Sequence, residues 1–388
     1  MKRTYLDHAA TTPLDPDVLS AMDPFLKDNF GNPSSIHDTG HRAHMAVTRA
    51  REQVADVLGA RPNEIIFTSG GTESDNLALK GAAEAHSFKG HLITTAIEHH
   101  AVLHTAQYLE KRGMEVTYLE PDSDGFVSAH SVTRAIREDT RLVSIMYANN
   151  EIGTVQPIAE IGNMLSKRVI AFHTDAVQAG GALSLNVKKL HVDLLSLSGH
   201  KFYGPKGIGA LYVKQGTEII PQQLGGGQEL KRRASTENVP GIIGFAEALA
   251  RAEKKREQES QRLAALRDVL FESVRTRMPE VISTGSLDTR LPNNVSLCVP
   301  GIEGEALVMR LSEHGFDTSS GSACTSGNLD PSHVLQAIGL PRSTALGSLR
   351  VTLGASTSPE DIEAFVAALE TEVTKLRKMS PVVDVACR

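Results

Sequence analysis

The stretch Leu194-Leu195-Ser196-Leu197-Ser198-Gly199-His200-Lys201 joins an apolar strand pattern to a polar loop that carries a lysine. Further short β-rich runs lie on both sides of it, and longer helical patterns separate most of them. These runs are Ile65–Thr68, Leu92–Thr95, Val116–Leu119, Leu142–Ile145, Val169–Phe172 and Ala210–Val213. Apolar strands that alternate with helices predict an α/β fold with a mainly parallel sheet covered on both faces. Ligands of such sheets bind at the carboxyl ends of the strands.

The C-terminal third of the sequence has a different pattern. A charge-dense stretch from Arg251 to Arg262 is interpreted as a solvated helix face that marks a domain junction. Beyond it the pattern predicts a smaller α+β domain. Its expected elements are strands near 295–299 and 348–353, helices over 303–314, 331–338 and 359–379, and a glycine- and serine-rich loop after the first helix.

The composition is that of an ordinary enzyme, with 40% apolar and 22% charged residues. Lys and Arg number 40 and Asp and Glu number 46, so the net charge of −6 gives no general attraction to nucleic acid or anionic lipid. We therefore expect neither a nucleic-acid partner nor a membrane partner. The N-terminus lacks the apolar stretch of a signal peptide, and the three cysteines are too few and too widely spaced for a disulfide framework. We expect a cytoplasmic protein.

Two motifs at strand ends indicate a bound phosphate and a charged ring. Thr68-Ser69-Gly70-Gly71-Thr72 leads from a strand into a helix, where free N–H groups and the helix dipole favour an anion. Asp175 follows the strand expected to end at Phe172, and a buried acid there needs a cation such as a protonated pyridine nitrogen. The alternatives are a plain strand-to-helix turn for the first motif and a helix cap for Asp175.

Lys201 is the third chemical group at a strand end. A lysine held at the sheet edge, away from bulk water, has a lowered pKa and can form a Schiff base. A lone loop lysine is usually only solvated, but here it follows a phosphate turn and a buried acid in the sequence. A phosphate cradle, an acid for a pyridinium and a Schiff-base lysine are the fixtures of a pyridoxal-phosphate site.

Cys324 lies in a loop of small polar residues, Ser319-Ser320-Gly321-Ser322-Ala323-Cys324-Thr325-Ser326-Gly327. A structural cysteine would have apolar neighbours, so Cys324 is a candidate nucleophile on a flexible arm. Cys298 lies in an apolar strand pattern and is interpreted as core packing, and Cys387 as incidental.

The histidines offer weaker signals. His37, His41 and His44 have the spacing of one helix face, which suits a metal ion, but no further ligand is in view and we expect no metal site. His8, in Asp7-His8-Ala9-Ala10, is a minor candidate for the substrate entrance.

Taken in order over nearly the whole chain, these motifs resemble the NifS/IscS family of pyridoxal-phosphate cysteine desulfurases. The loop around Cys324 resembles the group of that family with a long mobile cysteine loop. The motifs are Tyr5-Leu6-Asp7, Gly31-Asn32-Pro33-Ser34-Ser35, Gly71-Thr72-Glu73-Ser74, Glu98-His99, Ala148-Asn149-Asn150-Glu151, Asp175-Ala176-Val177-Gln178, Ser198-Gly199-His200-Lys201 and the segment Ser319 to Gly327.

The resemblance implies the architecture of fold-type-I aminotransferases. A large cofactor-binding domain would span residues 15–257, and a small domain would combine residues 1–14 with 258–388 and carry the cysteine loop 319–330. It also implies a homodimer that takes sulfur from L-cysteine, releases L-alanine and stores the sulfur as a persulfide. A sulfur-accepting protein, such as an iron–sulfur scaffold, would then receive it.

The resemblance also implies the roles of single residues at the cofactor. Lys201 would hold pyridoxal 5'-phosphate as a Schiff base and move the Cα proton, and His99 would stack on the ring as an acid and base. Asp175 would pair with the ring nitrogen, and Gln178 would bond the phenolic oxygen. The expected phosphate ligands are Gly71, Thr72, Ser198 and His200, with Thr236 reaching the phosphate of the other subunit.

At the substrate, the resemblance assigns three residues. Asn150, which also borders the cofactor, and Arg350 would hold the substrate carboxylate. Cys324 would attack the substrate sulfur.

Five positions depart from the family pattern. His is common where this chain has Leu346, Arg is common at the positions of Ala355 and Leu230, and Gly is common at those of Lys231 and Ser235. None of them removes a named catalytic role. Alternative functions are a related lyase that prefers selenocysteine, a desulfurase that serves thiolation of tRNA or DNA, and a non-catalytic scaffold.

Overall fold

The structure is a computed structural model that describes residues 3–321 and 330–379. Within these ranges the largest sheet has seven strands in the order β2-β8-β7-β6-β5-β3-β4. β8 is antiparallel to both neighbours, and the other pairs are parallel, so the predicted α/β class with a mainly parallel sheet is confirmed. The bounds are β2 Ile65–Thr68, β3 His91–Thr95, β4 Glu115–Leu119, β5 Thr140–Ser144, β6 Ala171–Asp175, β7 Leu194–Ser198 and β8 Gly209–Val213.

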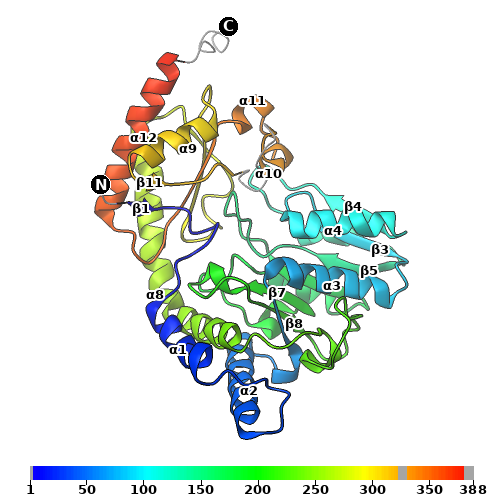
Figure 1. Cartoon of the computed structure of the whole chain (residues 1–388). Coiled ribbons are helices and arrows are strands. Elements are labelled where there is room, and N and C mark those ends of the chain that lie inside the picture. The colour runs from blue at the N-terminus through cyan, green and yellow to red at the C-terminus, as the bar shows by residue number, and fades with distance from the viewer. Residues whose placement is uncertain (1–2, 322–329, 380–388) are drawn as a thin grey trace.

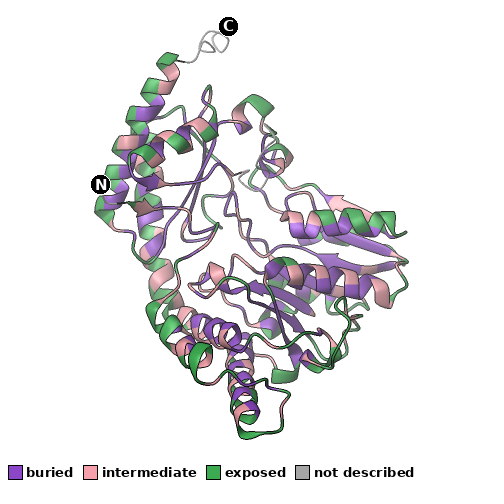
Figure 2. Cartoon of the chain, viewed as in Figure 1, coloured by how far each residue is buried: buried purple, intermediate pink, exposed green. Residues whose placement is uncertain are grey.

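Helices cover both faces of this sheet (Figure 1). Successive residues of a strand point to opposite sides of the sheet, so each strand has side chains to pack against the helices of both faces. On β2, Ile66 packs with α3 and α4, whereas Ile65 and Phe67 pack with α1, α2, α6 and the start of α8. The strands are buried throughout most of their length (Figure 2). The helices are α1 Pro16–Lys27, α2 Asp38–Leu58, α3 Gly71–Ala85, α4 His100–Lys111, α5 Ala129–Ala135, α6 Ile158–Leu165 and α7 Val187–Leu190.

The prediction for β6 is wrong in its bounds. The strand begins two residues later than expected and continues through His173 and Thr174 to Asp175. These polar residues are fully buried in the sheet interior, and His173 is bonded by hydroxyls of both neighbouring strands, at 2.8 Å from Ser144 and 3.0 Å from Ser196. Asp175 is therefore the last residue of the strand and does not follow it.

One long helix, α8 (Val239–Arg277), connects two of the hydrophobic clusters that the described residues form. Its first part packs against the large sheet's cluster through Phe245 and Leu249, and its last part packs in a second cluster through Leu266 and Leu270. The charge-dense stretch 251–262 lies between these parts without breaking the helix. The predicted division at residues 257 and 258 stays a prediction.

The second cluster is built on small sheets and includes the N-terminal segment. Leu6 packs in this cluster, and β1 (Thr4–Tyr5) pairs in parallel with β11 (Phe316–Asp317). The other elements are β9 Ile282–Ser283, β10 Asn294–Cys298, β12 Ser348–Thr352, α9 Gly304–Glu313, α10 His333–Ala337, α11 Arg342–Ala345 and α12 Pro359–Met379. No helix in the described ranges has the length and apolar character needed to cross a membrane.

Candidate active site

A cavity of about 310 Å³ lies at the carboxyl ends of β6 and β7 and at the start of α3. Its volume lies within the range of pockets that bind small ligands. The structure brings most of the predicted site residues to its wall: Gly71, Thr72, His99, Asn150, Asp175, Gln178, Ser198, His200, Lys201 and Arg350.

One end of the cavity is an anion cradle at the N-terminus of α3. The helix begins at Gly71, so Thr72 lies in its first turn. In the described part of the chain, the N–H groups of Gly71 and Thr72 have no hydrogen-bond acceptor, as at the start of any helix. A Cβ at Gly71 would lie 2.6 Å from the Val177 side chain, so the close approach of backbone and wall requires glycine.

A buried acid lies deeper in the cavity. Asp175 is 6% exposed, and its Oδ1 accepts a hydrogen bond from the N–H of Val177 at 2.9 Å. Burial raises the pKa of Asp175 to about 6, although the Val177 bond and the charge of Lys201 act in the opposite direction. The carboxyl is thus ready to pair with a cation in the cavity. Gln178 donates its amide N–H to the carbonyl of Ala9 at 3.0 Å.

Lys201 ends a 3-10 turn, Gly199–Lys201, and is not in the open loop that the sequence suggested. Its Nζ donates to the carbonyls of Ala9 at 2.5 Å and Ala10 at 2.8 Å. The N-terminal segment therefore orients the amine at the cavity wall. Burial and the nearby Lys201 charge lower the pKa of His200 to about 4, so its ring is neutral, and it lies 3.1 Å from the Thr11 hydroxyl.

His99 is fixed as a neutral ring at the N-terminus of α4. Its Nδ1 accepts a hydrogen bond from the N–H of Ala101 at 3.1 Å, so the proton of the neutral ring is on Nε2. Burial, followed by the charge of Lys201, lowers the pKa of His99 to about 4. A neutral imidazole with its proton on Nε2 can donate a hydrogen bond from that nitrogen to a group in the cavity.

Arg350 is a buried cation in the cavity wall. It is 5% exposed, and it donates at 2.9 Å to both the Asn150 carbonyl and the Asp7 carboxylate. Its buried Nε has no acceptor within the described residues. Because these two bonds use only two of the five N–H donors of the guanidinium, Arg350 suits a carboxylate ligand.

Other predicted groups are not assembled here. Thr236 is exposed and is absent from the cavity wall of this single chain, so its contact with a second subunit stays a prediction. Cys324 and Cys387 lie outside the described residues. Cys298 is fully buried, as expected for core packing, and burial raises the pKa of its thiol to about 12.

The histidines of α2 do not form a metal site. His37 is the N-cap of the helix and accepts from the N–H of Gly40, while His41 and His44 are exposed. Among the residues that the structure describes, no group of His, Cys, Asp and Glu side chains has a metal-binding arrangement.

Sequence reasoning missed part of the wall. Asp75, Met146 and Ala148 all line the cavity. Asp75 follows the glycine turn by one helical turn, and this spacing was the available signal for its position. Met146 and Ala148 are small or apolar residues just beyond β5. Only the strand order of the sheet shows that they lie at the same edge of the sheet as Asp175.

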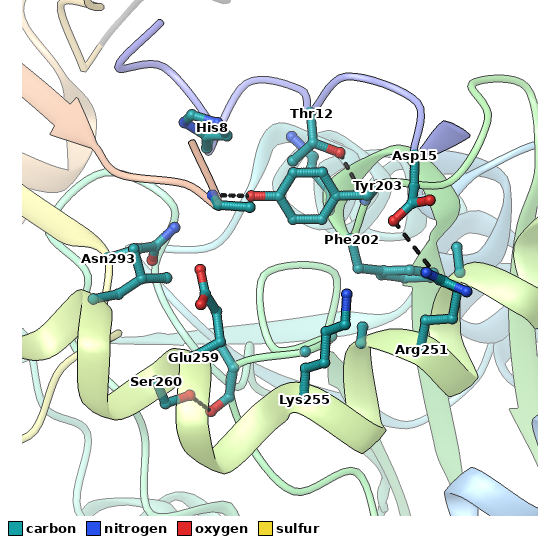
Figure 3. Close-up of a pocket in the computed structure, with 18 of the residues that line it drawn as sticks. His8, Thr12, Asp15, Phe202, Tyr203, Arg251, Lys255, Glu259, Ser260 and Asn293 are labelled. Carbon is teal, nitrogen blue, oxygen red and sulfur yellow. Dashed lines mark hydrogen bonds and ion pairs between the residues drawn. The ribbon is translucent and has the colours of Figure 1, made fainter. Parts of the chain in front are cut away.

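A second cavity, of about 360 Å³, shares Gln178 and Lys201 with the first (Figure 3). Its wall includes Lys255 and Glu259 of α8 and the N-terminal residue His8. His8 lines this cavity and not the first, and its Nδ1 lies 2.9 Å from the Thr352 carbonyl. Burial lowers its pKa, and the substrate-entrance interpretation of His8 stays a prediction.

Comparison with known proteins gives consistent similarities. The profile of the family described as Aminotransferase class-V matches residues 4–365. A cysteine desulfurase IscS of Clostridium botulinum is 52% identical over 383 residues, which is 98% of this chain and 96% of that protein. A solved NifS-like protein has a TM-score of 0.91 at 39% identity and covers 96% of this chain and 100% of its own. A structure titled SspA in complex with cysteine has a TM-score of 0.79 at 42% identity, covering 90% and 98%.

Proposed function

Because the chain belongs to the class-V aminotransferase family, within its IscS and NifS group, we propose that it converts L-cysteine to L-alanine as a cysteine desulfurase. The observation that carries this proposal is the convergence of Lys201, Asp175, His99 and Arg350 on one cavity. The family depends on pyridoxal phosphate, and the cavity fits that group. It offers unpaired amides at one end, a buried acid deeper in and an amine on its wall.

Different residues of the cavity wall would hold different parts of the cofactor. Gly71, Thr72, Ser198 and His200 would hold the phosphate, while Asp175 would face the ring nitrogen and Gln178 the phenolic oxygen. The bound cofactor supplies an aldehyde that joins to amines and a protonated ring that withdraws electrons.

The chain's own groups then act on the substrate. Arg350 and Asn150 would hold its carboxylate, and the amine of Lys201 would move the Cα proton. The thiolate of Cys324 would attack the cysteine sulfur, which breaks the Cβ–S bond and forms an S–S bond. With one proton delivered to Cβ and the Cα proton returned, the products are L-alanine and a persulfide on Cys324.

The fate of the sulfur belongs to the same proposal. A persulfide on Cys324 can be transferred to an acceptor protein, and we propose an iron–sulfur scaffold as that acceptor, with delivery to tRNA or DNA thiolation as the alternative. The family likeness also supports a homodimer, in which Thr236 of one subunit would reach the phosphate of the other. A cytoplasmic location remains the prediction made from the sequence.

The test is direct. Purified protein should be yellow, should lose that colour on borohydride reduction, and should release sulfide and alanine in equal amounts from L-cysteine with a reductant. A colourless protein that pyridoxal phosphate cannot reconstitute would indicate a scaffold. Release of selenide from selenocysteine without sulfide from cysteine would indicate the lyase.

Arg350→Lys should raise the KM for L-cysteine about 10- to 100-fold and change kcat less. The ammonium keeps the charge but loses the two-pronged contact, and a charged hydrogen bond contributes about 1.5–3 kcal/mol. Steady-state kinetics would measure both constants. Arg275→Lys is the control, since Arg275 is an exposed residue near the end of α8. A lower kcat at unchanged KM would contradict carboxylate binding by Arg350.

A further inference from the structure

Asp75 is a buried carboxyl in the cavity wall that the proposed reaction does not use. It lies on α3 and is 1% exposed. Its Oδ1 accepts no hydrogen bond from any described residue, and the nearest ring nitrogen, Nε2 of His173, is 3.6 Å away. Leaving a buried carboxylate oxygen unpaired is costly, so either the group is neutral or a cation is missing.

The groups that face Asp75 provide no counter-charge. Asp175 and His173 approach it from β6, Ser196 from β7, and Glu98 from the segment between β3 and α4. His173 is not a cation, because burial lowers its pKa to about 3 and hydroxyls occupy both of its ring nitrogens. Asp75 is therefore surrounded by other carboxyls and neutral groups.

We propose that Asp75 and Asp175 form a carboxyl pair that holds one proton at neutral pH, with Asp75 as the member that keeps it. Two buried carboxyls in one cavity cannot both ionise at low cost. Asp175 has the Val177 N–H and the nearby Lys201 to stabilise its charge. Burial and the charge of Asp175 raise the pKa of Asp75 well above its usual range, although a hydrogen bond from Ser196 acts in the opposite direction.

The consequence for the site is that one negative charge is kept on Asp175. A protonated ring nitrogen would then meet a single, fixed carboxylate, and Asp75 would be a positioning residue for that charge. This consequence for the cofactor rests on the proposed function. The shared proton itself does not.

The first measurement is the stability of the full-length protein at a fixed cofactor concentration. A carboxyl whose pKa is raised in the folded state costs stability as pH rises above its unfolded value of about 3.9. Asp75→Asn removes this cost. Its unfolding constant should therefore fall relative to wild type by up to about tenfold per pH unit between pH 6 and pH 8.

Controls separate a shared proton from a general charge effect. Asp56→Asn removes an exposed carboxylate of α2 and should show no such pH-dependent gain. In an Asp175→Asn background, Asp75 loses its like-charged neighbour and ionises at lower pH, so the gain from Asp75→Asn should be smaller. An equal gain in both backgrounds, or no pH-dependent gain at all, would overturn the pair.

The second measurement detects the proton itself in the folded proteins. The infrared spectrum of wild type at pH 7 should contain a carboxylic-acid carbonyl band that Asp75→Asn lacks. Burial raises the pKa of Glu98 to about 8, so Glu98 contributes to both spectra and cancels in the difference. A difference spectrum without that band would overturn the proposal. Neither readout requires turnover, so an inactive enzyme with these results would refute the proposed function and leave the proton pair intact.

Discussion

Replacing Lys201 by alanine should reduce sulfide release from L-cysteine at least about a thousandfold. The loss of a positioned acid–base group alone costs about 10²–10⁴-fold, and here the same amine would also hold the cofactor. The amine is already oriented, because the carbonyls of Ala9 and Ala10 accept from Nζ at 2.5 and 2.8 Å. A small side chain at this position leaves no substitute amine with that geometry.

Two assays would measure this loss. Sulfide release gives the rate, and mass spectrometry after borohydride reduction locates the pyridoxyl group, which should be on the peptide that contains Lys201. Lys188→Ala, at an exposed position of α7, is the control and should keep both activity and attachment. Normal turnover by Lys201→Ala, or attachment at another lysine of wild type, would remove Lys201 from the mechanism.

Most of the large sheet could be predicted from the sequence because its strands are short apolar runs between helical patterns. β6 is the exception, since its second half is His173-Thr174-Asp175 and a run of polar residues does not predict a buried strand. Their burial depends on hydroxyls of β5 and β7, which are remote in sequence. The interpretation of residues 251–262 as a helix face is confirmed, but the full length of α8 was not predicted, because this charged middle part has no apolar periodicity.

The site was predictable where a motif carries several chemical groups in a row. Gly71 and Thr72, or His200 and Lys201, occur together in the sequence and lie together in the cavity. The pairing of Asp7 with Arg350 joins residues 343 positions apart, so no local pattern contains it. The chemistry of Asp75 was also hidden, since its partners come from β6 and from the segment after β3.

Two departures from the family pattern have a backbone consequence. Lys231 and Ser235 stand where the family often has glycine, and their φ angles are +64° and +117°. Residues other than glycine rarely adopt these φ angles, and the backbone strain costs of order 1–3 kcal/mol of folding free energy for each residue. The segment that leads to Thr236 thus retains a conformation that favours glycine without having glycine there.

Replacing Cys324 by alanine should also reduce sulfide release at least about a thousandfold, but with a different signature from Lys201→Ala. The variant should keep the yellow colour and should still change colour when L-cysteine is added, because the groups that would bind cofactor and substrate are intact. What it lacks is the thiolate that would accept sulfur. We expect binding without turnover.

The protein contains its own matched control for this prediction. Cys298 is fully buried between β9 and β12, and burial raises the pKa of its thiol to about 12, so it is neither accessible nor ionised at neutral pH. Cys298→Ala should therefore keep normal sulfide release. Incubation with sulfur-labelled cysteine should label wild type and Cys298→Ala at Cys324 and leave Cys324→Ala unlabelled. Because the two substitutions remove the same thiol chemistry from different environments, normal turnover by both variants would show that neither Cys324 nor Cys298 has to accept the sulfur, and the mechanism with a persulfide on Cys324 would be wrong.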